Sequence, residues 1–339
     1  MARADLKNFS KRDALHSPTL SYLTLMYGFG GFGAGLACVL SADWRWWPLG
    51  VLLLAHTVAW CGLLSHDAMH NAIFRSRRMN HLSGAWLTWI SGACYFPFEL
   101  LRDQHLEHHR YHVGVDGFSV TRWLKQQSRL VRALVIAAEW AYIPVLTVLI
   151  NIRSRALPLY DPANHYLRGR VLRVFCVRVS ALVLMAWIQP WAPLLYLASH
   201  FVMIHFMRLY DCFHHTFDVY PRGAKPTFPD EYLQENTYSS LFSRKRAWLN
   251  WVFLNYGYHN AHHEKPHVPW HALPALDAAM FGESEAHCLV GRNLFWTYHH
   301  HRLNRIHTDL GRPRVENGRL NTQEYWGIIM NITFLSYSP

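Results

Sequence analysis

Charged side chains are scarce in this chain. Asp, Glu, Lys and Arg make up 16% of its 339 residues, while 51% of the residues are hydrophobic. An average soluble protein has about 25% charged residues. This shortage argues against an ordinary soluble domain and favours a membrane domain with an extramembrane cap.

Paired cysteines are also missing. None of the six cysteines forms a CxxC pair, so the chain has neither a thiolate metal motif nor an evident disulfide framework. We expect buried free thiols. The polar N-terminus does not lead into the short apolar core of a cleavable signal peptide. The cysteines are Cys38, Cys61, Cys94, Cys176, Cys212 and Cys288.

The net charge of +11 does not indicate a nucleic-acid partner. The basic residues lie between apolar runs rather than in one patch, as in the cytoplasmic loops of membrane proteins. Fifteen Trp and 17 Tyr agree with this interpretation, because these rings collect at membrane–water interfaces.

Four apolar runs predict membrane-spanning helices in two hairpins. The first pair covers about residues 20–42 and 49–65, and the second covers 174–189 and 191–210. Two further runs are weaker. Residues 82–98 are too short to span, since about 20 residues are needed. Residues 130–150 are interrupted by charge and proline, so we expect that segment to lie in the interface, to re-enter, or to pair with another segment.

Three histidine clusters dominate the polar part of the chain. Their members are separated by three or four residues, which places imidazoles on one helix face. Eight imidazoles are too many for one zinc ion, which takes four ligands. The count suits two transition-metal ions with nitrogen-rich shells. The clusters are His66 and His70; His105, His108 and His109; and His259, His262 and His263.

The clusters constrain the topology because ligands of one site must lie on one side of the membrane. Two crossings precede the first cluster, and the second hairpin supplies the even number needed before the third. Basic residues at the N-terminus and in 102–129, 151–173 and 243–246 predict that this side is cytoplasmic. We therefore expect an all-α membrane protein with about four spanning helices and a helical cytosolic cap that carries the metal site. Its parts would be a cytosolic segment 1–19, a membrane domain 20–275 and a cytosolic segment 276–339.

The order of the three clusters and the paired apolar hairpins resemble the membrane-bound fatty acid desaturase superfamily over roughly residues 20–275. The resemblance implies two iron ions, dioxygen as co-substrate, and a fatty acid or acyl-lipid substrate in the bilayer. Zinc would not serve, because it has no accessible redox change. In this superfamily a ninth histidine follows the last spanning helix, with an amide or carboxylate four residues earlier. Asp211 and His215 have that spacing, so we expect them on one helix face, with His215 as ligand, Asp211 near the metal and His214 pointing elsewhere.

Four other polar residues are candidates to orient the ligands from behind: Asp67, Glu107, Asn255 and Glu264. For the three acidic residues, solvation is an equally good interpretation, and Asn255 is also a candidate helix cap. No residue pattern identifies the substrate-binding side chains.

The resemblance leaves several reactions open. Desaturation is the first expectation, and oxidative decarboxylation of a free fatty acid to a terminal alkene, as in one bacterial branch, is the alternative. A carotenoid ketolase or hydroxylase and a zinc-dependent membrane hydrolase are weaker readings. The chain shows no electron-carrier domain, so we expect an external ferredoxin-type donor with its reductase, docked on the basic face. The expected location is a bacterial inner membrane, multi-pass, with the metal site and both termini cytoplasmic.

Overall fold

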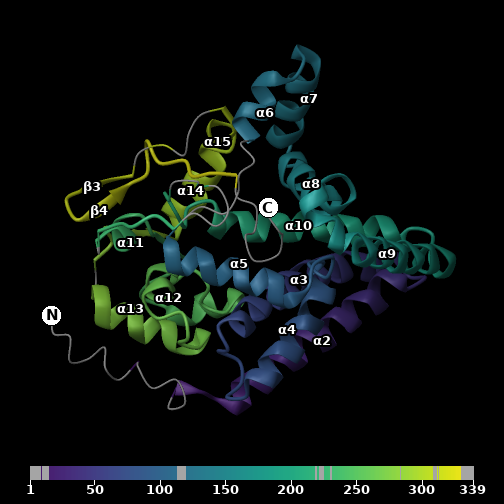
Figure 1. Cartoon of the computed structure of the whole chain (residues 1–339), viewed down its shortest axis with the longest axis horizontal. Helices are drawn as coiled ribbons and strands as arrows, with labels where there is room; N and C mark the ends of the chain where they lie inside the picture. Colours follow the sequence, from purple (N-terminus) through teal and green to yellow (C-terminus); the bar gives the residue numbers. More distant parts are fainter. Residues whose placement is uncertain are drawn as a thin grey trace.

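The computed structural model describes residues 9, 15–112, 120–217, 220, 225–229, 231–282, 284–307, 311 and 313–329. Four helical segments in this part of the chain are long and apolar enough to cross a membrane, which confirms the expected number. They contain α2 (Pro18–Leu40), α3 (Trp47–Met69), α9 (Arg168–Ile188) and α10 (Ala192–Asp211). Helix α3 packs against both α2 and α10 (Figure 1).

The first hairpin is held by a close approach of two helices. Ser17 caps α2 by accepting the Leu20 N–H at 3.4 Å, and Pro18 occupies the first helical position. A Cβ added at Gly35 would lie 2.8 Å from Leu54 Cγ, so only glycine permits this spacing. The turn between the helices is the short 3-10 helix η2 (Trp44–Trp46).

The predicted weak run 130–150 is not a straight crossing. It forms α7 (Arg129–Trp140) and α8 (Val145–Tyr160), which are bent by 112° at the intervening break. The break leaves polar groups that need partners. Glu139 accepts the Leu146 N–H at 2.8 Å and pairs with Arg208 of α10 at 2.8 Å, and both charged side chains are buried. The ion pair therefore fixes the bent segment to α10.

Two further helices contact α3. Helix α4 (Arg77–Ser91) packs along α3, and α5 (Phe98–Tyr111) follows after a reversal at residues 92–97. Gly92 ends α4 in the left-handed conformation with φ +84°. The second histidine cluster lies on α5, so the reversal brings it back toward the end of α3.

The remaining elements are short. Most of them cover the end of the bundle where α3 and α10 finish, whereas α6 lies beside α7 and η3 joins α8 to α9 (Figure 1). The sheets are small: one parallel pair, β1 with β2, and one antiparallel pair, β3 with β4. The elements are α6 (Val120–Gln126), η3 (Pro162–Leu167), α11 (Tyr232–Glu235), β1 (Ser239–Leu241), η4 (Ala247–Phe253), α12 (His259–Glu264), η5 (Trp270–Ala272), α13 (Leu273–Phe281), β2 (Cys288–Val290), α14 (Arg292–His300), α15 (Asn304–His307), β3 (Arg314–Glu316) and β4 (Arg319–Asn321).

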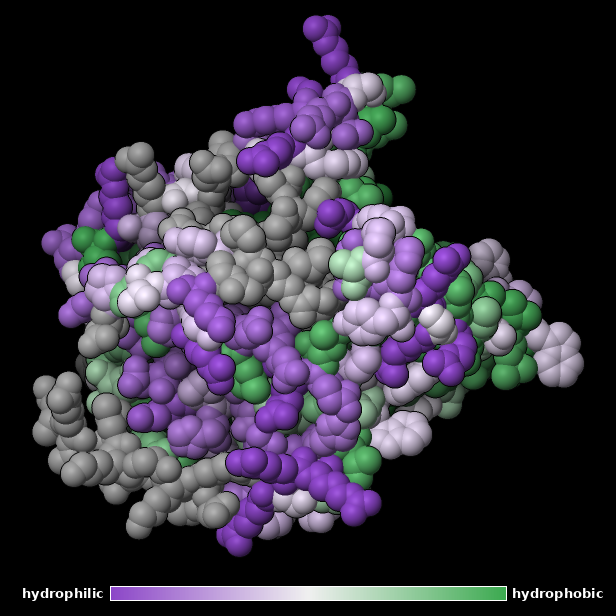
Figure 2. All heavy atoms as spheres, in the orientation of Figure 1, coloured by the Kyte–Doolittle hydropathy of each residue, from purple (hydrophilic) through white to green (hydrophobic). Residues whose placement is uncertain are grey.

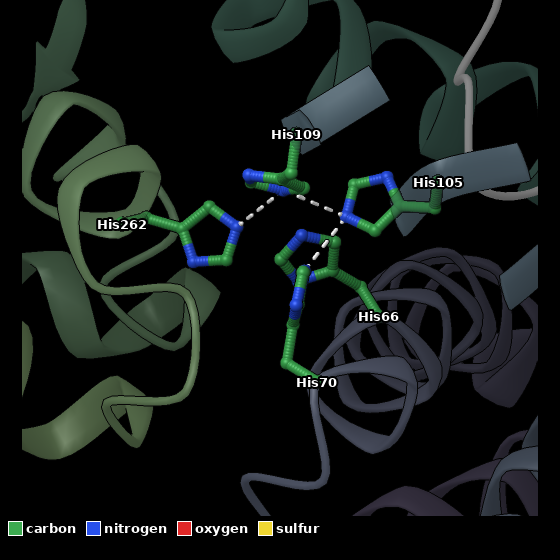
Figure 3. A group of neighbouring side chains, drawn as sticks. All are labelled: His66, His70, His105, His109 and His262. Carbon is green, nitrogen blue, oxygen red and sulfur yellow. Dashed lines mark hydrogen bonds between the residues drawn. The ribbon is translucent and has the colours of Figure 1, made fainter. Parts of the chain in front are cut away.

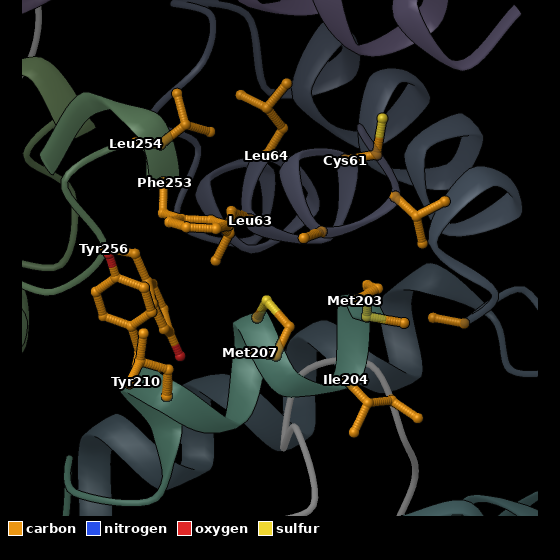
Figure 4. Close-up of a cluster of buried hydrophobic side chains, with 14 of the residues drawn as sticks. Cys61, Leu63, Leu64, Met203, Ile204, Met207, Tyr210, Phe253, Leu254 and Tyr256 are labelled. Carbon is orange, nitrogen blue, oxygen red and sulfur yellow. The ribbon is translucent and has the colours of Figure 1, made fainter. Parts of the chain in front are cut away.

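One buried core joins the long helices to this cap. Leu63 of α3 and Met207 of α10 contribute to the same cluster as Phe253 and Tyr256 (Figure 4). By contrast, α9 presents large apolar side chains at its surface, with Trp187 83% exposed. Figure 2 shows hydrophobic residues concentrated on the lobe at right, which contains α9. The apolar surface there is the one expected to face lipid.

We predict that the buried Arg208–Glu139 pair is needed for stability. Arg208→Ala leaves a buried carboxylate without its partner, a loss that costs about 3–5 kcal/mol in comparable sites. Thermal unfolding in detergent should show a large drop in Tm. The double variant Arg208→Met, Glu139→Gln removes both charges but keeps an acceptor for the Leu146 N–H. Its drop in Tm should therefore be smaller.

The control is Arg314→Ala, which removes the exposed pair with Glu324. An exposed pair contributes at most about 1 kcal/mol. If Arg208→Ala and Arg314→Ala lowered the Tm equally, the buried ion pair would not be what holds the bent segment.

Candidate metal centre

Five histidines converge in one group at the end of the helical bundle. One ring nitrogen from each lies within 4.8 Å of the corresponding atoms of the others, a spacing that could hold a metal ion. The rings come from three elements and point toward a common centre (Figure 3). The members are His66 and His70 from α3 and its end, His105 and His109 from α5, and His262 from α12.

A second group lies beside the first. His108, His215 and His263 bring one nitrogen each within 4.8 Å of one another. His259 adjoins them, with its Nε2 atom 2.8 Å from Nε2 of His215. The structure therefore brings all nine predicted histidines together, divided between two adjacent groups.

Helix periodicity explains the division. Successive residues on an α-helix differ by about 100°, so adjacent histidines cannot point into one site. On α5, His105 and His109 face the first group, while His108 faces the second. On α12, His262 joins the first group and His263 the second. Two helices therefore supply histidines to both groups and fix the spacing between them.

The nitrogen spacings fit metal coordination. His105 Nε2 lies 2.8 Å from His70 Nε2 and 3.1 Å from His109 Nε2. His109 Nε2 is in turn 3.2 Å from His262 Nε2. Two nitrogens bound at right angles to one ion at about 2.1 Å would be about 3 Å apart. In the second group, both ring nitrogens of His263 are buried and have no hydrogen-bond partner, as expected of a side chain that binds a metal ion.

The site keeps its imidazoles neutral. Burial, reinforced by the neighbouring imidazoles, holds the pKa of seven of these histidines well below the usual 6.5. Neutral imidazole is the form that binds a metal ion. The seven are His70, His105, His109, His215, His259, His262 and His263.

The expectation that Asp211 and His215 share a helix face is wrong. Helix α10 ends at Asp211, so His215 reaches the second group from a non-helical segment that forms a β-bridge with Thr237. For the same reason His214 does not point away from the site. Its buried ring lies parallel to His259, with centroids 3.9 Å apart.

Sequence reasoning missed Tyr256. Its hydroxyl donates to Oδ1 of Asp211 at 2.8 Å. The ring centroid is 5.5 Å from that of His66 and 5.6 Å from that of His259, so Tyr256 touches both metal groups. Its position three residues before the third cluster was the available signal, but a tyrosine there has no characteristic spacing.

The four supporting residues have different surroundings. Oδ1 of Asp67 lies 3.4 Å from Nδ1 of His66, in position to orient that ring. Glu107 is exposed on α5, whereas its neighbours in the second cluster face inward. Asn255 donates to the backbone carbonyl of Trp270 at 3.0 Å and so holds the loop rather than a ligand. Glu264 accepts from Gln234 at 3.3 Å.

A close backbone approach fixes the third cluster. The Ser240 N–H donates to the Gly257 carbonyl at 2.8 Å, which ties the loop before α12 to β1. A Cβ at Gly257 would overlap the Ser240 carbonyl oxygen, so only glycine fits. Asn260 of α12 also hydrogen-bonds Ser239 of β1 at 2.9 Å.

Comparison with known proteins agrees with this site. The family model for fatty acid desaturase matches residues 44–293, and the chain therefore belongs to that family. It is 23% identical to the human (Homo sapiens) sphingolipid delta(4)-desaturase DES1, over 80% of this chain and 76% of that protein. It is also 24% identical to a fatty acid desaturase of Bacillus subtilis, over 71% of each chain. Membership and the apolar helices identify an integral membrane oxidoreductase.

We predict that the two histidine groups bind metal separably. His263→Ala removes a member of the second group and leaves the five histidines of the first, so iron measured by mass spectrometry should fall from about two to about one per chain. His307 is exposed on α15, and His307→Ala should leave iron unchanged. Full loading of His263→Ala, or an equal loss in His307→Ala, would contradict two separate sites.

Proposed function

We propose that this protein is a membrane-bound, non-haem di-iron enzyme that uses dioxygen to desaturate a fatty acyl chain. The supporting observation is the pair of adjacent histidine groups, which share α5 and α12 and are buried at the end of the membrane helices. Nitrogen ligands from neutral imidazole suit iron.

The proposed ligands are divided as the two groups are. The first iron would be held by His66, His70, His105, His109 and His262. The second would be held by His108, His215, His259 and His263. Asp211 lies next to Tyr256 and His214: its Oδ1 accepts from the Tyr256 hydroxyl and is 3.8 Å from Nδ1 of His214.

Bound iron would supply the reductive activation of dioxygen that removal of hydrogen from an unreactive C–H bond requires. The protein's own side chains orient the histidines and line the site. Asp67 orients the His66 ring. The side chains of Leu63, Leu254, Tyr256 and Leu273 lie beside His66, Asp67 and His262 around a small cavity and form an apolar wall on that side of the histidines. Apolar walls also keep water from the reacting centre.

The distribution of charge supports the proposed sidedness. Basic residues concentrate near the ends of the helices at the metal centre, and positive loops favour the cytoplasm. We therefore propose a multi-pass protein of a bacterial inner membrane, with the metal centre and both termini in the cytoplasm. The basic residues are Arg75, Arg77, Arg78, Arg102, Arg110 and Lys125.

The central test is product analysis. Purified protein loaded with iron and supplied with a ferredoxin–reductase system should consume dioxygen and convert a fatty acyl substrate to an unsaturated acyl chain with the same number of carbons. Gas chromatography of extract and headspace identifies the product. A terminal alkene shorter by one carbon would instead establish decarboxylation. A preparation that holds one zinc ion per chain and releases a hydrolysis product would reject the oxidative assignment.

We also predict that electron delivery depends on salt. A small acidic donor would be steered to the basic face, and that attraction weakens as the Debye length falls from about 10 Å at 0.1 M to about 3 Å at 1 M ionic strength. Turnover at limiting ferredoxin should therefore decrease with added salt. Turnover driven by a small uncharged reductant is the control and should change little. Equal salt sensitivity in both assays would exclude electrostatic docking.

A further inference from the structure

Three arginine side chains converge on the reversal between α4 and α5. Arg155 comes from α8, and Arg170 and Arg178 come from α9. None of these elements is part of the hairpin that they contact. The three guanidinium groups therefore tie the second half of the membrane domain to residues 89–96 of the first half.

Every contact of the first two arginines is with a neutral group. Arg170 donates to the Cys94 carbonyl at 3.0 and 3.2 Å and to the Phe96 carbonyl at 3.4 Å. Arg155 donates to the Gly92 carbonyl at 3.4 Å and lies over the ring of the adjacent Tyr95. These bonds satisfy carbonyls that the reversal leaves free.

Arg178 lies about two turns further along α9 than Arg170. It donates to the Trp89 carbonyl, at 3.2 Å to the Tyr196 hydroxyl, and at 3.5 Å to the Cys94 sulfur. Ten residues separate it from the end of α9 at Ile188, which is about 15 Å along a helix. That is about half of the roughly 30 Å thickness of a bilayer's hydrocarbon core.

These neutral acceptors leave the charge unbalanced. Within the described part of the chain, no Asp or Glu forms an ion pair with Arg155, Arg170 or Arg178. Each guanidinium has five N–H donors, so donors remain for a further ligand. Unpaired charge inside a membrane is costly and characteristically marks the binding site of a partner of opposite sign.

The arginines also have a defined relation to the metal centre. Phe96 lies two residues before α5 begins, and His105 lies seven residues into that helix. The separation from Phe98 to His105 is about 10 Å along the axis. An anionic group at the arginines would therefore be too far from the histidines to react, while a chain attached to it could reach them.

We propose that Arg155, Arg170 and Arg178 bind the ionised carboxylate of a free fatty acid substrate and position a mid-chain carbon at the metal centre. This inference deepens the proposed function and rests on it for the reaction. It favours desaturation over decarboxylation, because the carbons next to the carboxylate lie away from the histidines. Guanidinium is the side chain best matched to a carboxylate.

The test is photolabelling of the full-length protein in nanodiscs of phosphatidylcholine. The probe is a palmitic acid that carries a diazirine next to its carboxylate, and labelled peptides are mapped by mass spectrometry. Label is expected near residues 89–96. Unlabelled palmitate should compete, and hexadecanol should compete far less. Label confined to the peptides that carry the histidine clusters would overturn the proposal.

Matched variants distinguish an effect of the lost guanidinium charge from an effect of impaired folding. Arg155→Gln and Arg178→Gln should each reduce labelling about tenfold, since a bond to a charged group contributes about 1.5–3 kcal/mol. Arg178→Lys should retain more label than Arg178→Gln. Arg173→Gln is the control, because Arg173 is exposed and donates to the Gly169 carbonyl of its own helix. Unchanged labelling in the Gln variants, or equal loss in Arg178→Lys and Arg178→Gln with a lowered Tm, would show that these arginines serve only the reversal.

A competition arm identifies the source of the anion. If phosphatidylglycerol displaces the probe as well as palmitate does, the arginines bind a bilayer phosphate and the substrate assignment is overturned. Labelling needs neither iron nor dioxygen. Wild-type protein that binds palmitate through the arginines but holds no iron pair would therefore reject the proposed function and leave the carboxylate site intact.

Discussion

The arrangement of this protein depends on holding nine imidazoles together at one end of the helical bundle. Each ring loses water on burial and keeps polar nitrogens that need a partner, so the site is unfavourable unless a metal ion compensates. The long helices, the reversal between α4 and α5 and the short elements around α12 all meet at this point. Because α5 and α12 each serve both histidine groups, the two sites cannot move independently.

The membrane helices and the cap contribute in different ways. Helices α3 and α10 end at the metal centre and carry an apolar core that continues into residues 253–256. The cap supplies the third cluster through α12, which has only six residues and is held by contacts with β1. A helix so short is not stable by itself, so its histidines are positioned by tertiary contacts rather than by helical propensity.

The arginines inside the membrane domain have two different kinds of partner. Arg208 is matched by Glu139, and the pair fastens the bent segment α7–α8 to α10. Arg155, Arg170 and Arg178 have no such match among the described residues and donate instead to backbone carbonyls at the α4–α5 reversal. That difference is why the first arrangement is assigned to stability and the second to the recognition of an anion.

The sequence by itself determined the all-α class, the number of membrane spans and eight of the histidines, because apolar length and three-to-four-residue spacing are local properties. His215 was found through the resemblance to a family, but the helix proposed to carry it was wrong, since nothing local marks the end of α10 at Asp211. Only the tertiary structure decided which histidine joins which group, placed His214 and Tyr256 beside the site, and showed that Glu107 is exposed. It also brought three arginines from α8 and α9 to the α4–α5 reversal. The arginine contacts join residues 63 to 89 positions apart, and they depend on how helices pack rather than on any pattern within one segment.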